Sequence, residues 1–424
     1  MEQLAEKGAG ADESHIPGSS YCRRREAGLS KFGGFLLKVA FSLADGSALI
    51  KGLRRLGFRW IPRHWTQKII VATLIAWAPL LILSAYEGFA WGNKVQIPFL
   101  VDMVQYARFL VALPCAIALG EYVNPRLEAI LNSFLKSGIV LSKDFPSYEN
   151  AISRARVLTS SIIPELVILA LVYAYASLGL QREGAAAISS WNHPGAEASM
   201  STTAASLWFL FVSMPLLLFT WFLWVWRLCV WAYLLFQISR LDLRVVATHP
   251  DCGGGLNFVH VGMRRFSVLF FGISSILSAS IGEEIVFSGA SLHSYELELA
   301  VFFFICLAVI LGPVLVFTPI LIRSKLEYWG KYAPLASDYV QGFDAKWIEQ
   351  KDYATQRLLG SSDIQSLADL RHSYAGIAEM RTVLANKNTV AIFAFAYVVP
   401  TLPLLASVIS LRRILSEVYS LLLK

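Results

Sequence analysis

The sequence has little charge, few cysteines and no catalytic motif. Only 16% of its 424 residues are charged, where soluble domains have about 25%. Its five cysteines form no C-x-x-C pair, which excludes a zinc ribbon and a disulfide framework. The G-x-S-x-G, H-E-x-x-H and Walker A motifs are missing, as is the mid-span lysine that a retinal-type cofactor needs. The sequence leaves enzymatic activity open but favours a function that is not enzymatic. It also predicts that the chain holds no cofactor.

Hydrophobic residues, by contrast, make up 56% of the chain. They gather in blocks of about 20 residues or more, the length that an α-helix needs to cross about 30 Å of hydrocarbon. The alternating ten-residue strands of a barrel are missing. We therefore predict an all-α fold, a polytopic transmembrane helical bundle of about seven spans with cytosolic helical segments. The predicted spans are 69–91, 98–123, 160–180, 206–236, 266–289, 299–322 and 390–410.

Basic residues lie almost entirely between these blocks. Residues 1–67 hold eleven Lys and Arg and residues 323–387 hold nine, whereas residues 290–298 hold none. Because basic loops stay in the cytosol, the N-terminus and the insertions at 124–159, 237–265 and 323–387 are predicted to be cytosolic. The net charge of +7 is thus explained by topology and lipid headgroups, and no nucleic-acid partner is expected.

Three regions divide the chain. Residues 1–30 predict a disordered cytosolic tail. Residues 31–67 mix apolar and basic side chains and predict an amphipathic helix region on the membrane surface. Residues 68–424 form the bundle with its insertions.

The last apolar block has two interpretations. Pro400 and Pro403 can kink or break a helix, so the block could be a re-entrant hairpin that returns Arg412 and Arg413 to the cytosol. Its length is sufficient for a full crossing, which we favour.

Two arginines lie inside the predicted spans. Arg108 is about 15 Å from the outer end of its span, and Arg227 is predicted at a similar depth. A guanidinium stays charged in the membrane and needs acceptors, so these residues either pair with carboxylates or form an anion pathway. Trp224 and Trp231 could stack on Arg227. The candidate carboxylates are Asp102, Glu121, Glu165, Glu283 and Glu284, and the substrate-pathway candidates are Arg108, Arg227, Glu165 and Asp102.

The stretch RLDLRVVATHPDCGGGLNFVH, residues 240–260, follows the fourth predicted span. Its anion or metal candidates are Asp242, Arg244, His249, Asp251, Gly253, Gly254 and Gly255. Four interpretations stay open. The stretch is a helix-capping turn, a phosphate or headgroup cradle made by glycine amides, a metal site that also uses His260, or an HPD loop like that of J-domains.

Four blocks carry a resemblance to a known family: VQYARFLVALPCAIALGEYV, SRLDLRVVATHPDCGGGLNFV, YAPLASDYVQGFDAKWI and LLGSSDIQSLADL. With them the chain resembles a family of uncharacterised bacterial inner-membrane proteins with a THPDxxGGL-type block. The resemblance covers roughly residues 95–405. It implies a location in the bacterial cytoplasmic (inner) membrane and provides no catalytic residues. Cys252 stands where the family blocks often have a basic or small residue.

Three functional hypotheses follow. The first is a channel or transporter for a small, anionic solute. The second is a membrane-embedded enzyme that acts on lipid headgroups or phosphate esters at the cytosolic face. The third is a non-catalytic scaffold or sensor. The expected partners are the lipid bilayer and a small anionic solute, and a homo-oligomer is left open.

Overall fold

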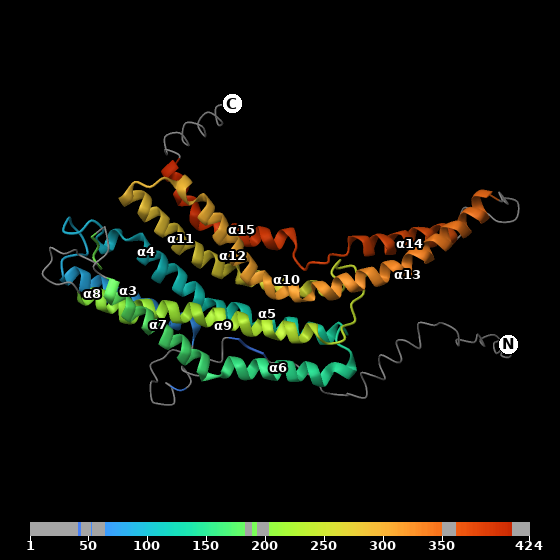
Figure 1. The fold of residues 1–424 in the computed structure, drawn as a ribbon, viewed down its shortest axis with the longest axis horizontal. Helices are drawn as coiled ribbons and strands as arrows, with labels where there is room; N and C mark the ends of the chain where they lie inside the picture. The colour runs from blue at the N-terminus through green and yellow to red at the C-terminus, as the bar shows by residue number, and fades with distance from the viewer. Residues whose placement is uncertain are drawn as a thin grey trace, which may run out of the picture. The chain divides into compact units, whose positions relative to one another are not determined.

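The computed structural model describes residues 41–43, 52, 64–182, 189–192, 203–349 and 362–408. These residues are almost all helical (Figure 1). Within the described ranges there is no strand, only isolated bridges between Ile97 and Ser190 and between Val140 and Leu243. The all-α prediction is confirmed. The predicted tail at 1–30, most of the predicted surface helix at 31–67, and Arg412 and Arg413 lie outside the described residues.

Seven helical segments of the described chain are long and apolar enough to cross a membrane. Each overlaps one predicted block, and most extend beyond it into the neighbouring connection. The chain is therefore a multi-pass integral membrane protein in contact with the lipid bilayer. The segments are Trp65–Tyr86, Met103–Lys136, Ser142–Leu178, Ala204–Ser239, Asn257–Ser288, Leu292–Glu349 and Lys387–Leu405.

The spans are built from α-helices with short 3₁₀ (η1, η3, η5, η6, η7) and π (η2, η4, η8) stretches between them. The first half contains α3 (Trp65–Tyr86), η1 (Phe99–Val101), α4 (Met103–Tyr106), η2 (Ala107–Ala112), α5 (Leu113–Lys136), η3 (Ser142–Asp144), α6 (Phe145–Ser160), α7 (Ile162–Arg182), α8 (Ala204–Trp208), η4 (Phe209–Ser213) and α9 (Met214–Ser239). The second half contains α10 (Asn257–Met263), η5 (Arg264–Phe266), α11 (Ser267–Ser288), η6 (Leu292–Tyr295), α12 (Glu296–Leu311), η7 (Gly312–Phe317), α13 (Thr318–Asp344), η8 (Ala345–Glu349), α14 (Ser362–Glu379) and α15 (Lys387–Val408).

The helix connections gather at two ends of the bundle. We call the end with connections 87–102, 189–192 and 289–295 the Trp191 end. The end with connections 137–144, 240–256 and 380–386 is the Asp251 end. Figure 1 shows α4 and α8 near the first end, and α13 leading away from the second.

The final block forms one helix as far as the described residues reach. α15 continues through Pro400 and Pro403 to Val408. Proline leaves carbonyls of its own helix without their amide partners. Here Ser274 and Ser278 of α11 donate hydrogen bonds to the carbonyls of Tyr397 and Pro400. The alternative of a re-entrant hairpin within this block is therefore wrong, because α11 stabilises a continuous helix in its place.

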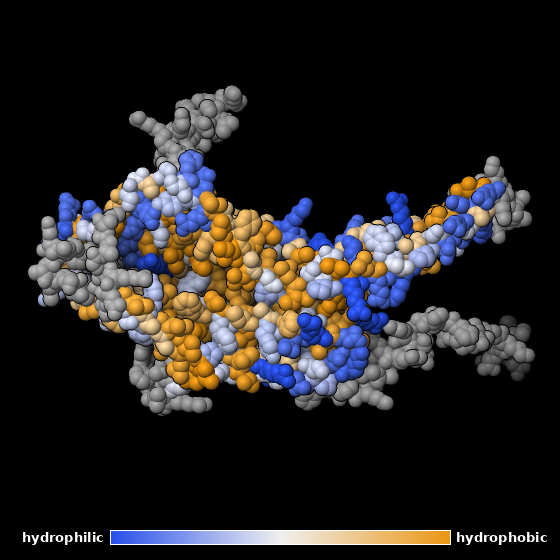
Figure 2. All heavy atoms as spheres, in the orientation of Figure 1, coloured by the Kyte–Doolittle hydropathy of each residue, from blue (hydrophilic) through white to orange (hydrophobic). Residues whose placement is uncertain are grey.

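Apolar side chains fill the Trp191 end and also cover much of the surface. A buried cluster there includes Phe99, Phe109, Trp191 and Phe209. Elsewhere the helices expose large apolar side chains such as Leu171, and the hydrophobic surface in Figure 2 extends over the long helices. An apolar surface of this kind is stable against lipid tails rather than water.

The last part of the sixth segment forms a helical hairpin with α14. α13 runs out of the membrane-spanning part, and α14 packs back along it (Figure 1). Asp363 accepts hydrogen bonds from Lys346 Nζ at 2.8 Å and Trp347 Nε1 at 3.0 Å at the far tip. Lys325 Nζ donates to the carbonyls of Ala378 and Met380 at the base, where the last carbonyls of α14 need donors. Both ends of the hairpin are thus pinned by charged side chains.

Candidate functional site

Asp102 organises the Trp191 end. It is the N-cap of α4, and its Oδ1 accepts the Gln105 amide at 3.0 Å. Its Oδ2 accepts Gln105 Nε2 at 3.1 Å and Trp191 Nε1 at 2.8 Å. Trp191 is fully buried, and a backbone pairing between Ile97 and residues 189–191 positions it. Asp102, a pathway candidate, is therefore already satisfied by three donors from the protein.

Arg108 lies one turn beyond Gln105, within the π-helical stretch η2. π-Helical stretches are rare and occur often at functional sites. Arg108 is half-buried, and no described residue hydrogen-bonds its guanidinium or places a carboxylate oxygen within 4.0 Å of it. Asp102 and Glu283 are nonetheless close enough to act on it electrostatically. The guanidinium thus has nearby negative charge but no direct partner.

Glu283 of α11 is the second ionisable side chain at this end that has no direct partner among the described residues. It is half-buried, and the charges that act on it are those of Asp102, Arg108 and Glu284. It has no hydrogen bond to a described residue, whereas Glu284 accepts one from the hydroxyl of Tyr295. Figure 2 shows hydrophilic atoms set back between hydrophobic surfaces near the start of α4. Arg108 and Glu283 together form what we call the Arg108–Glu283 site.

Arg227 lies elsewhere. Phe109 and Phe209 make an edge-to-face ring contact with 6.3 Å between centroids, which sets Arg108 level with the start of η4. Residue 227 follows residue 209 by 18 positions, or about 27 Å of helix. The prediction that Arg108 and Arg227 share one depth is therefore wrong, because the second span begins only after Asp102 and Arg108 lies near its start, whereas Arg227 lies in the second half of α9.

The predicted stacking on Arg227 is confirmed for one tryptophan. The guanidinium carbon lies 4.8 Å from the centroid of the Trp224 ring. Trp224 is held in turn by a 2.7 Å hydrogen bond from its Nε1 to the carbonyl of Ala116. Trp231 instead lies beside Phe41. Arg227 is therefore a half-buried residue that packs on Trp224, distinct from the Arg108–Glu283 site.

Glu165 is also separate from that site. It lies in the first turn of α7 and is 2% exposed. Tyr175, the α7 residue close enough to influence Arg108 electrostatically, comes ten positions later, which is about 15 Å along the helix. The four pathway candidates are thus not brought together in one place.

Asp251 closes the loop at the Asp251 end with its own side chain. Oδ1 accepts the amides of Gly253 at 2.8 Å and Gly255 at 3.1 Å, and Oδ2 accepts the amide of Asn257 at 3.1 Å. His249 Nδ1 lies 2.9 Å from Oδ1. Burial acts to raise the pKa of Asp251, but these hydrogen bonds outweigh it and lower the pKa below its ordinary value.

The glycines make this closure sterically feasible. Gly254 and Gly255 have φ of +64° and +90°, and a Cβ on Gly254 would lie 2.3 Å from Val245 Cγ1. The amides that a phosphate cradle would use, those of Gly253 and Gly255, already face Asp251. The interpretation as a helix-capping turn accounts for this geometry. The phosphate or headgroup cradle stays a prediction, and the geometry does not favour it.

The other candidate residues of the loop lie in different surroundings and do not form one cluster. Asp242 forms an exposed ion pair with Lys143 at 2.6 Å, and the amide of Arg244 donates to the carbonyl of Ile139. His260 is buried, and both its ring nitrogens lack a hydrogen-bond partner. Among the described residues no three His, Cys, Asp or Glu side chains are grouped as a metal would require. The described residues therefore do not form the group of ligands that the metal interpretation requires.

No protein-family model, curated protein or solved structure matches the chain. Function must therefore be argued from the residues alone.

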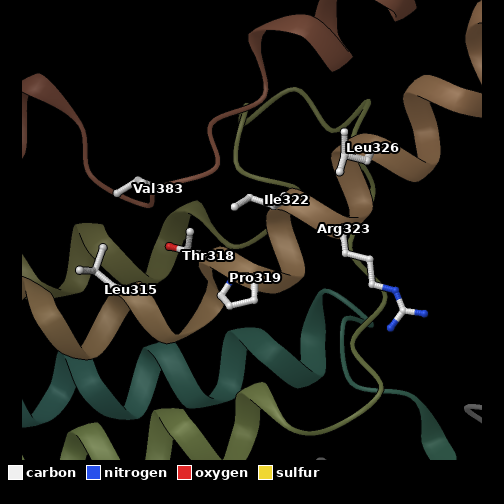
Figure 3. Close-up of a pocket in the computed structure, with 7 residues that line it drawn as sticks. All are labelled: Leu315, Thr318, Pro319, Ile322, Arg323, Leu326 and Val383. Carbon is white, nitrogen blue, oxygen red and sulfur yellow. The ribbon is translucent and has the colours of Figure 1, made fainter.

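An open groove lies at the foot of α13 (Figure 3). It measures about 800 Å³ and is almost wholly apolar. Its lining residues are Leu315, Thr318, Pro319, Ile322, Arg323, Leu326 and Val383. Figure 3 shows the guanidinium of Arg323 extending away from the apolar side chains. The groove has no residue in common with the Arg108–Glu283 site or with the Asp251 loop.

Two residues that complete the Asp102 network were not predicted. Gln105 could have been found, because an acidic N-cap followed three positions later by Gln is the pattern of a capping box. Trp191 has no local signal, since it reaches Asp102 from 89 positions away through the pairing of two connections. Glu283 was one of several candidate carboxylates, and nothing in its neighbourhood distinguished it.

Proposed function

We propose that this chain is a transporter or channel for a small solute with a negatively charged group, and that the solute passes Arg108. One observation carries the proposal: a half-buried guanidinium near the start of the second span, in a π-helical stretch, with no described residue as a direct partner. Charged groups within a membrane span are costly and tend either to pair or to serve a pathway. Among the described residues Arg108 has no direct partner, which favours the second role.

The alternation of basic and non-basic connections supports a bacterial inner-membrane orientation with a cytosolic N-terminus. On that orientation the Trp191 end faces the periplasm and the Asp251 end the cytosol. The Arg108–Glu283 site then lies near the periplasmic entrance. The resemblance to bacterial inner-membrane proteins is consistent with this location.

The experiment is solute uptake by purified protein in liposomes. Chloride, phosphate, acetate and small amino acids would be offered as labelled solutes to wild type and Arg108→Gln. At least one solute should enter through wild type and enter about tenfold more slowly through the variant. Arg227→Gln is the matched control, since its charge lies outside the site. If no solute shows uptake that depends on Arg108, the proposal is wrong.

A second candidate function, a scaffold, has its own observation. The α13–α14 hairpin exposes apolar side chains beyond the apolar block 299–322, and Leu335 and Ile348 are 52% and 58% exposed. Photocrosslinkers at these two positions of the full chain, in cells, should give one discrete adduct that Leu335→Glu abolishes. Crosslinking only to lipid or to many proteins would remove this candidate. The headgroup enzyme draws no comparable support, because Asp251 is held by its own loop.

A further inference from the structure

The Arg108–Glu283 site contains two opposite charges that do not touch. Glu283 and Arg108 act on each other electrostatically, yet neither has a hydrogen bond or an ion pair within 4.0 Å to a described residue. The two residues come from different helices, η2 and α11, which pack against one another. Both side chains therefore keep hydrogen-bonding capacity that no described residue uses.

The charge balance of the site favours a particular kind of solute. With Glu283 ionised, Asp102, Arg108 and Glu283 carry two negative charges and one positive charge. Asp102 has three donors of its own, so its hydrogen-bonding capacity is used, and its charge balances that of Arg108. Glu283 is left without a balancing positive charge. A simple anion on Arg108 would add a third negative charge where the low dielectric strengthens repulsion.

We propose that the solute is a small zwitterion, with its anionic group on Arg108 and its cationic group on Glu283. This inference rests on the proposed function and names its substrate class. A zwitterion leaves the net charge of the site unchanged and gives both open side chains a partner. A guanidinium offers a planar pair of donors to a carboxylate, and a carboxylate accepts from an ammonium or attracts a quaternary one.

The test compares solutes that differ by one charged group. Liposomes with wild-type protein would be offered labelled glycine, alanine and betaine as zwitterions, acetate and propionate as the matched acids, and methylamine as the matched cation. We expect the zwitterions to enter at least tenfold faster than the acids or the amine. Faster uptake of the acids than of every zwitterion would overturn the inference and leave the proposed transport of anions standing.

Substitution of Glu283 separates the inference of a zwitterionic solute from the proposed transport past Arg108. Glu283→Gln should lower zwitterion uptake at least tenfold while acid uptake stays equal or rises, because the repelling charge is gone. Arg108→Gln should abolish both. Glu284→Gln is the matched control, and its uptake should equal that of wild type. Unchanged zwitterion uptake in a folded Glu283→Gln protein would refute the role of Glu283. If no solute enters even through wild type, the proposed function fails as well.

Discussion

The carboxylate of Asp251 lies 2.8 Å from the amide of Gly253 and 3.1 Å from that of Asn257, so one side chain joins the glycine turn to the start of α10. Both oxygens are in use, and both partners are backbone groups that a helix start or turn would otherwise leave unpaired. The most unusual stretch of the sequence is thus explained first by local folding.

Removal of this carboxylate should destabilise the protein. Asp251→Ala leaves three part-buried amides without an acceptor, which should cost about 2 kcal/mol. The measurement is thermal unfolding in detergent, and a lowered midpoint is expected. Asp242→Ala is the control, because its ion pair with Lys143 is exposed and contributes under about 1 kcal/mol. Equal effects of the two substitutions would contradict the role of Asp251.

The same carboxylate predicts an acid dependence. Its pKa is lowered from the ordinary 3.8, so its contribution to stability is complete above that pH. The contribution declines as the pH falls further, toward the lower pKa of the folded state. The difference in unfolding free energy between wild type and Asp251→Asn should therefore shrink below about pH 4. A difference that is constant from pH 6 to pH 3 would contradict the prediction.

Gly254 should not tolerate a side chain. Alanine there would have to adopt φ of +64° with its Cβ 2.3 Å from Val245, so Gly254→Ala should destabilise by more than about 1 kcal/mol. Gly330 of α13 is the control: a Cβ there meets nothing within 4 Å, and a helix gains about 0.5–1 kcal/mol from the change to Ala. Opposite shifts of the unfolding midpoint are expected, and shifts of the same sign would refute the argument.

Two serines should hold α15 to α11. Ser274→Ala combined with Ser278→Ala removes both hydroxyl donors to the α15 carbonyls, at about 0.6 kcal/mol each for hydrogen bonds inside a membrane. Ser275 bonds only to its own helix, at the carbonyl of Phe271, and Ser275→Ala should be close to neutral. Unfolding in detergent checks both. A double variant as stable as Ser275→Ala would show that the serines do not stabilise the pair.

Trp191→Phe isolates the bond to Asp102. The ring stays in the apolar cluster while the donor to a carboxylate is lost, which should cost about 1.5 kcal/mol. Trp221→Phe is the matched control, because the buried Nε1 of Trp221 has no hydrogen-bond partner. Loss of that N–H should therefore lower the free energy of unfolding by less. Thermal unfolding of the two variants gives the comparison, and a larger loss for Trp221→Phe would be inconsistent with the Asp102 network.

The spans could be predicted because hydrocarbon imposes length and composition on each of them separately. The extension of α5 to Lys136 and the packing of α14 on α13 could not, since polar helices outside the membrane depend on tertiary partners. The depth of Arg108 was misjudged because the apolar block begins at Pro98, whereas the helix begins only after Asp102. The partial charge balance of Arg108 and Glu283 depends on the pairing of η2 with α11, which no local pattern encodes.

The turn held by Asp251 also joins distant parts of the chain. The carbonyl of Cys252 accepts the amide of Arg381 at 2.8 Å, and the amide of Arg244 reaches Ile139 at 2.8 Å. The return segment of the hairpin is therefore coupled mechanically, through one short loop, to the ends of the second and fourth spans. A displacement of the hairpin would therefore be transmitted through this loop to those two spans, and a tilt of the spans would move the hairpin in turn.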